Sequence, residues 1–147
     1  MILPREAGEG DGRQMAPAGR PVTRVLIAAA APAVREALAW AFDAEPDFTV
    51  AGTATGGSDV ITAAGVLRPE LVILEIDLPG PDGFAVARLL AGAPVPPCVV
   101  LLSLHDAAHS RRLAAACGAA ACLAKSEGWP ELIRRVRLLL SPARPDS

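Results

Sequence analysis

The sequence predicts an α/β fold, a doubly wound sheet of five parallel strands with helices on both faces. Five short apolar segments alternate with five segments of helical periodicity between residues 22 and 140. Most of the apolar segments are continuous instead of alternating, which is typical of parallel strands buried on both faces. Right-handed crossovers between successive strands would then place helices on both sides of the sheet.

Length and composition narrow the class of protein. The 147 residues suffice for one domain whose core needs neither a disulfide nor a metal. No apolar run approaches the roughly 20 residues that span a bilayer. The net charge of −2 argues against direct binding of nucleic acid. Cys98, Cys117 and Cys122 lie in apolar stretches, so we expect buried, reduced thiols in a cytoplasmic protein without membrane contact.

The two ends of the chain are expected to be tails. Residues 1–21 are rich in glycine and proline and show no apolar period, which predicts a flexible tail. Residues 141–147 contain Pro142 and Pro145 and predict a short C-terminal tail. A single domain over residues 22–140 remains.

The predicted strands are short and evenly distributed along this domain. They cover residues 25–28, 48–51, 71–74, 98–102 and 120–123. The last is the weakest, because alanine, which fills its first two positions, is a poor strand former.

Helix signals fall between these strands. Pro32, Ser58, Gly83 and Asp106 mark the first four helix starts, and Ser126 or Pro130 marks the fifth. Gly118 is expected to end the fourth helix. Helical spacing predicts that these residues face the core: Val34, Leu38, Phe42, Val60, Ile61, Ala64, Leu67, Leu113, Ala116, Cys117, Leu132, Ile133, Val136 and Leu139.

Chemically distinctive side chains follow three of the strands. Glu75 comes after the third strand, Ser103 after the fourth and Lys125 after the fifth, while Ala29 and Ala30 follow the first. A doubly wound sheet places its site at the carboxyl ends of the strands. We therefore expect a carboxylate, a hydroxyl and an ammonium group to converge there.

Four segments carry distinctive motifs in a fixed order: residues 25–32, 71–83, 99–106 and 118–125. In this order and spacing they resemble the receiver domain of response regulators, most closely the NarL/FixJ-like subgroup. The resemblance covers residues 22–140 and implies a flavodoxin-like (βα)5 fold with strand order 2-1-3-4-5. It also implies a role in bacterial two-component phosphorelay signalling.

The resemblance identifies three departures from the family pattern. In the family, the first strand ends in two acidic residues that hold a divalent cation, and these positions are Ala29 and Ala30 here. The phosphoacceptor aspartate is replaced by Glu75. The aromatic switch residue, three positions before Lys125, is replaced by Cys122.

These departures predict that the phosphorylation chemistry is lost. Phosphoryl transfer to a carboxylate needs charge neutralisation, usually by Mg²⁺ held through carboxylates, and alanine supplies no ligand. We therefore expect no bound Mg²⁺ or other metal, no cofactor and no catalytic residue. The longer side chain of Glu75 is expected to reach toward Ser103 and pair with Lys125, a partial mimic of a phosphorylated site.

The segment after the third strand is expected to be a shaped turn without a catalytic role. Its residues are types that favour turns and helix caps. They are Asp77, Pro79, Gly80, Asp82 and Gly83.

The leading functional hypothesis is a pseudo-receiver, a stand-alone atypical response regulator that is not an enzyme and acts by phosphorylation-independent protein–protein contact. In receivers, partners such as a histidine kinase, another regulator or a second copy bind the face of helix four, strand five and helix five. The basic residues there either are simply solvated or belong to that partner surface. They are Arg111, Arg112, Arg134, Arg135, Arg137 and Arg144.

Two alternatives stay open at this point. The alanine-lined strand ends could form a pocket for a small metabolite. The chain could also be the receiver half of a split DNA-binding transcriptional regulator, because these 147 residues leave no room for a helix-turn-helix output domain.

Overall fold

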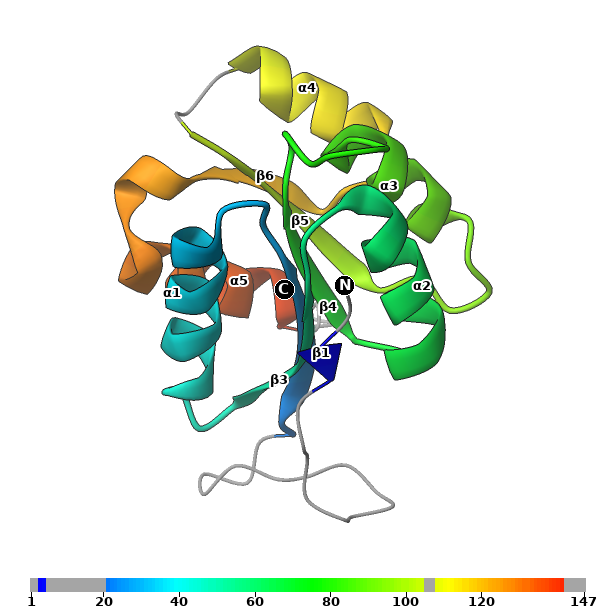
Figure 1. The fold of residues 1–147 in the computed structure, drawn as a ribbon. Coiled ribbons are helices and arrows are strands. Elements are labelled where there is room, and N and C mark those ends of the chain that lie inside the picture. The colour runs from blue at the N-terminus through cyan, green and yellow to red at the C-terminus, as the bar shows by residue number, and fades with distance from the viewer. Residues whose placement is uncertain (1–2, 5–20, 105–107, 142–147) are drawn as a thin grey trace, which may run out of the picture.

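A computed structural model describes residues 3–4, 21–104 and 108–141 of the chain (Figure 1). The described strands form one six-stranded sheet in the order β1-β3-β2-β4-β5-β6. The strands are β1 (Leu3–Pro4), β2 (Thr23–Ala28), β3 (Phe48–Ala54), β4 (Leu71–Glu75), β5 (Cys98–Ser103) and β6 (Ala121–Ala124). The α-helices are α1 (Pro32–Asp43), α2 (Gly57–Leu67), α3 (Gly83–Ala91), α4 (Ala108–Ala116) and α5 (Trp129–Leu140).

Five of these strands confirm the predicted parallel sheet. β2 pairs in parallel with β3 on one side and with β4 on the other, and β5 and β6 follow outward from β4. Counted from the first parallel strand, the order is 2-1-3-4-5, as expected. None of the helices in the described part of the chain is long and apolar enough to cross a membrane.

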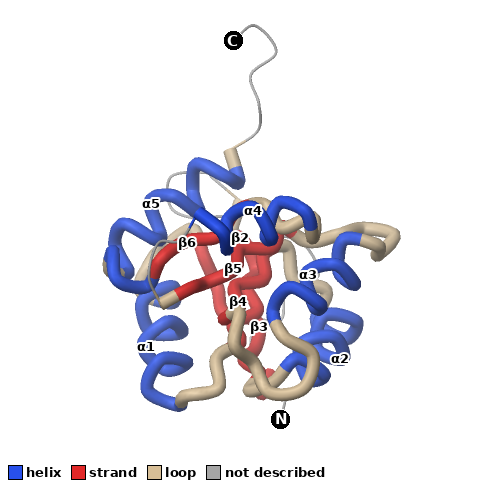
Figure 2. The backbone as a smooth tube through the Cα atoms, turned by 90° about the horizontal axis from the view of Figure 1, so that it is seen from above, coloured by secondary structure: helices blue, strands red, loops and turns tan. Residues whose placement is uncertain are grey.

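The helices cover both faces of the sheet and create two cores. Figure 2 shows α1 and α5 on one side, with α2 and α3 on the other. Side chains alternate along each strand, so Ile27 packs toward α1 and α5, while its neighbour Leu26 packs toward α2 and α3. Phe42 and Phe48 meet edge to face, with ring centroids 5.0 Å apart, in the α1–α5 core.

The N-terminus differs from the expected tail at two residues. Leu3–Pro4 pairs antiparallel with β3, in register with Thr53 and Gly52. β3 is the edge of the parallel sheet, so its free backbone groups accept an extended segment, and proline is tolerated in such an edge position. Residues 1–2, 5–20 and 142–147 of the expected tails lie outside the described residues.

The predicted helix starts at Pro32, Gly83 and Pro130 are confirmed, and the one at Ser58 is wrong. α2 begins at Gly57 with Gly56 as its cap, not at Ser58. Ser126 lies in a short 3-10 turn (Lys125–Glu127) that precedes α5, and Pro130 occupies the first turn of that helix as expected. The fourth predicted start, Asp106, lies outside the described residues.

Three predicted core residues of the last two helices are exposed. In α4, Ala114 is buried, whereas Leu113 is 39% exposed and Ala116 is exposed. One residue of helix corresponds to a rotation of about 100°, so an error of one position turns the predicted face outward. Leu139 is 38% exposed in the last turn of α5. Gly118 ends the α4 region at a φ of +86°.

Candidate functional site

Glu75, the last residue of β4, is the centre of the candidate site. Its side chain is buried, and Oε2 accepts a hydrogen bond from Nζ of Lys125 in a salt bridge. Its second oxygen, Oε1, accepts the backbone N–H of Ala30 at 3.2 Å. The structure therefore shows the expected pair with Lys125, and adds a link to the loop after β2.

Strand register explains why these residues meet. Ala28 lies opposite Leu74, so Glu75 emerges beside the loop that begins at Ala29. On the other side of β4, Ser103 lies opposite Ala124 in the β5–β6 pair. Lys125 directly follows β6, so it lies at the same edge of the sheet as Ser103. Ser103 is half-buried at this rim. The carboxyl ends of parallel strands thus bring the predicted site residues to one edge.

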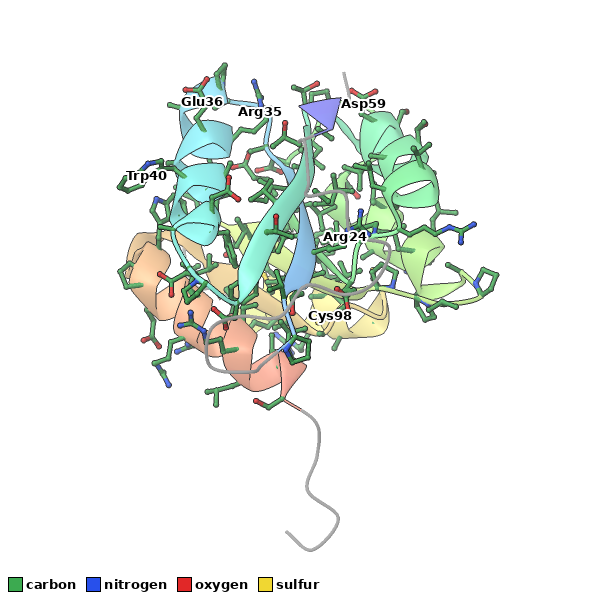
Figure 3. The ribbon with its side chains drawn as sticks, turned by 90° about the horizontal axis from the view of Figure 1, so that it is seen from below. Arg24, Arg35, Glu36, Trp40, Asp59 and Cys98 are labelled. Atoms are coloured by element: carbon green, nitrogen blue, oxygen red, sulfur yellow. The ribbon has the colours of Figure 1, made fainter. Side chains whose placement is uncertain are left out.

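Arg35 on α1 was not predicted to belong to this region. Its Nη1 donates to the carbonyl oxygens of Ala29 at 2.9 Å and Ala30 at 3.3 Å. Figure 3 shows Arg35 at the N-terminal end of α1, beside the loop that follows β2. The only sequence signal is an arginine in the first turn of a helix that directly follows this loop.

The residues at the rim do not fit a magnesium site. Mg²⁺ requires oxygen ligands, usually including carboxylates. The side chains of Ala29 and Ala30 supply none, and their carbonyl oxygens already accept from Arg35. The carboxylate of Glu75 is engaged by Lys125 and by an amide. Within the described ranges, no group of three or more His, Cys, Asp or Glu residues could hold a metal ion.

The loop after β4 is a tightly bonded turn, as expected from its residue types. Asp82 caps α3, because its Oδ1 accepts the N–H of Ala85 at 2.9 Å. Gly80 has a φ of +76°, a conformation that other residues rarely adopt. Gly83 donates to the Ile76 carbonyl at 2.8 Å, and a Cβ on Gly83 would lie 2.7 Å from the Glu75 carbonyl oxygen.

The same loop is fixed against the start of α2. Pro79 accepts the N–H of Gly57 at 3.0 Å. A Cβ on Gly57 would lie 2.0 Å from the Pro81 carbonyl oxygen, so only glycine fits there. Asp77, in the same loop, is exposed.

Cys122 lies on β6 within the core beneath α4. It is 9% exposed and packs in the cluster that contains Val99, Ala114 and Cys117. The thiol stands where the family pattern has a large aromatic ring, and the loss of that ring's inward–outward rotation stays a prediction. Cys98, by contrast, is half-buried instead of buried, and burial still raises the pKa of its thiol.

The arginines of α5 are engaged in ion pairs. Arg134 and Arg135 both bond to Glu131, which lowers the pKa of that exposed carboxyl to about 2, Arg134 contributing most. Arg137 donates to both oxygens of Asp47 at 2.8 Å and also pairs with Glu45. These bonds raise the pKa of the Arg137 guanidinium. The predicted Arg144 lies outside the described residues.

The comparisons with known proteins identify the family. The family model described as response regulator receiver domain matches residues 25–137. The chain belongs to the response-regulator receiver family. The resemblance found in the sequence is thereby confirmed. Receiver domains are components of two-component signalling. Among solved structures, the receiver domain of the putative response regulator NarL from Mycobacterium tuberculosis is 28% identical, with a TM-score of 0.75 over 79% of this chain and 94% of that one.

Curated relatives of this receiver are longer proteins. A protein-glutamate methylesterase/protein-glutamine glutaminase from Anaeromyxobacter dehalogenans is 36% identical over 85% of this chain, but the match covers only 36% of that relative. An uncharacterized transcriptional regulatory protein, YxjL of Bacillus subtilis, is 29% identical over 78% of this chain and 52% of its own length. The aligned receiver is non-enzymatic in itself.

Proposed function

We propose that this receiver signals by protein–protein contact and without phosphorylation at its strand-end rim. The observation that carries the proposal is the engagement of both Glu75 carboxylate oxygens, one by Lys125 and one by the Ala30 amide. A phosphoacceptor needs an oxygen free to attack in line and a cation beside it. Here the acceptor position is occupied by an internal ion pair.

The electrostatics of the rim support the same proposal. Lys125 and Arg35 bring two positive charges to a region with one buried carboxylate. These two positive charges lie in the region where a divalent cation would bind, and they repel such a cation. Glu75 is also one methylene longer than aspartate, which displaces its oxygens by about 1.5 Å from the geometry of an acceptor aspartate.

The proposed signalling surface is the face formed by α4, β6 and α5. Three leucines are exposed on or beside its elements: Leu104 is 64% exposed, Leu113 39% and Leu138 63%. Arg112, on the same helix as Leu113, is exposed as well. Apolar side chains among arginines suit a protein partner, for which we propose a histidine kinase or another regulator in the cytoplasm.

Incubation with a small phosphodonor and Mg²⁺, followed by intact-mass measurement, tests the proposal. We expect no gain of a phosphoryl group in the wild-type chain. Glu75→Asp alone is expected to stay unmodified, since the cation ligands are still missing. A triple variant with Ala29→Asp, Ala30→Asp and Glu75→Asp is the positive control. Phosphorylation of the wild-type chain would overturn the proposal.

A second candidate function is the receiver part of a longer or split DNA-binding regulator. It is favoured by the match to YxjL, a transcriptional regulatory protein of which this chain covers 52%. A helix-turn-helix protein encoded nearby that co-purifies with this chain would support this candidate. A metabolite at the alanine-lined strand ends stays a prediction, and a thermal-shift screen of metabolites would test it.

A further inference from the structure

The outer edge of β3, on the side away from β2, carries the chain's own N-terminal strand. β1 runs antiparallel to β3, with Leu3 opposite Thr53 and Pro4 opposite Gly52. Figure 1 shows β1 beside β3 at the edge of the sheet. The sheet order places β6 at the opposite edge, so this contact is separate from the proposed signalling surface of α4, β6 and α5.

The direction of the backbone groups determines which residues of β3 can bind a neighbouring strand. The carbonyl of Ala54 accepts the N–H of Ala29, so the backbone groups of Ala54 face the β2 side. Successive residues of a strand direct their backbone groups to opposite sides, so those of Thr53 face outward and those of Gly52 face β2. Thr53 therefore offers one donor and one acceptor to a segment that lies along the outer edge.

The first half of the same outer edge is bonded to the segment between α1 and β3. The N–H of Val50 donates to Oδ1 of Asp43 at 3.1 Å, and the N–H of Phe48 donates to the carbonyl of Glu45 at 3.3 Å. Backbone groups at a sheet edge bind extended segments only where they are not already engaged. The part of β3 that can accept another strand is thus residues 51–54, the β3 edge.

β1 has the right backbone pattern for the β3 edge, but it is short. Pro4 has no N–H, and it lies opposite Gly52, whose backbone groups face β2, so the proline loses no bond to β3. A strand of two residues near the end of a chain makes few ladder bonds, and such terminal segments open at little cost in free energy. A longer extended segment with the same pattern can therefore displace β1.

We propose that the β3 edge is a docking surface for an extended, proline-containing segment of a partner protein, and that β1 occupies this edge until the partner displaces it. The partner segment runs antiparallel to β3, with a residue other than proline opposite Thr53 and its proline opposite Gly52. In such strand addition, main-chain hydrogen bonds supply the affinity. β1 belongs to the same chain, so it competes with the partner at a high effective concentration.

Titration of the ¹⁵N-labelled full chain with a peptide of the sequence of residues 1–8, followed by the amide NMR shifts of Gly52, Thr53 and Ala54, tests the proposal. Leu3→Pro removes the backbone donor opposite Thr53, so we expect this variant to release β1 and to show saturable shifts with the peptide. The wild-type chain should bind the peptide at least about threefold more weakly, because β1 competes. Pro4→Ala is the matched control and should behave as the wild type.

A second peptide, with an N-methyl group on the backbone nitrogen of its leucine, shows whether backbone pairing is responsible. It cannot donate to Thr53, so we expect no shift at these amides in the Leu3→Pro chain. Equal binding of the two peptides, or no saturable shift at Thr53 with the unmodified peptide, would overturn the proposal. Sedimentation tests a second copy as the occupant. We expect Leu3→Pro to leave the oligomeric state unchanged, and a wild-type dimer that this variant abolishes would also overturn the proposal.

Discussion

Two carboxylates are buried in the described part of this receiver, and they lie at opposite ends of the sheet. Asp47, 8% exposed, precedes β3 at the amino end of the sheet, and Glu75, 9% exposed, ends β4 at the carboxyl end. Each carboxylate is paired with a cation from the C-terminal part of the chain, Arg137 or Lys125. At each end of the sheet, a buried carboxylate is therefore stabilised by a paired cation.

The two pairs differ in how strongly their geometry is fixed. Arg137 grips both oxygens of Asp47 with a planar fork, binds Glu45 and lies 5.6 Å from the centre of the Phe48 ring. Lys125 makes a point-charge contact with one oxygen of Glu75, and the other oxygen is held by an amide. The Asp47–Arg137 pair at the amino end is therefore a rigid structural clamp. The Glu75–Lys125 pair at the carboxyl end has fewer contacts, so a few substitutions suffice to change it.

The largest expected effect comes from breaking the structural clamp. Arg137→Met leaves the carboxylate of Asp47 buried without its bidentate partner. We expect a loss of about 2 to 3 kcal/mol in the free energy of unfolding, at the low end for a buried pair because the Arg137 side chain is 36% exposed. Urea titration measures it. Arg134→Met is the control, and its exposed ion pair with Glu131 should contribute far less to stability.

Breaking the pair at the rim is expected to cost less. Lys125→Met removes one charged partner of Glu75, but the amide bond from Ala30 remains. We expect a loss of about 1.5 kcal/mol in the free energy of unfolding, measured in the same urea titration. A loss larger than that of Arg137→Met would contradict the ranking of the two ends.

Removing Arg35 tests whether this arginine alone excludes Mg²⁺ from the rim. Arg35→Ala frees the carbonyl oxygens of Ala29 and Ala30 and is expected to cost about 1 kcal/mol or less. Mg²⁺ is expected not to raise the melting temperature of this variant, because two carbonyls do not replace two carboxylates. Stabilisation of Arg35→Ala by Mg²⁺ would show that the arginine alone excludes the ion.

The smallest expected effect concerns the ion pairs of Glu131 with Arg134 and Arg135 on the surface of α5. The pKa of Glu131 is lowered from 4.5 to about 2, first by Arg134 and then by Arg135. A carboxyl with a lowered pKa in the folded state contributes stability that is present above pH 4.5 and is lost as the pH falls toward 2. The stability difference between wild type and Glu131→Gln should therefore shrink over that range. A difference that grows with acidification would contradict the assignment.

Local sequence patterns were sufficient for the sheet and for part of the rim. Continuous apolar strands predict a parallel sheet, and their carboxyl ends predict that Glu75 and Lys125 meet. The contact of Arg35 with the Ala29 and Ala30 carbonyls could not be predicted, because it depends on the path of a loop. The close approach of Gly57 to Pro81 is invisible in sequence for the same reason.

Long-range pairing limited the prediction for α5. The sequence shows Arg137 only as one of several basic residues on a helix. Its partner Asp47 lies 90 residues earlier, and the two meet only when α5 packs beside the segment between α1 and β3. The arginines of α5 are therefore paired with acidic residues of the same chain. A count of charges along the helix does not reveal these pairs.

We propose that this receiver's strand-end rim holds an internal ion pair in place of a divalent cation. Titration of the ¹⁵N-labelled protein with Mg²⁺, followed by amide NMR shifts at Ala29, Ala30 and Glu75, tests it most directly. We predict no saturable shift in the wild-type chain at millimolar Mg²⁺, and a saturable shift in the variant with Ala29→Asp, Ala30→Asp and Glu75→Asp. Saturable binding at these three amides of the wild-type chain would contradict the account.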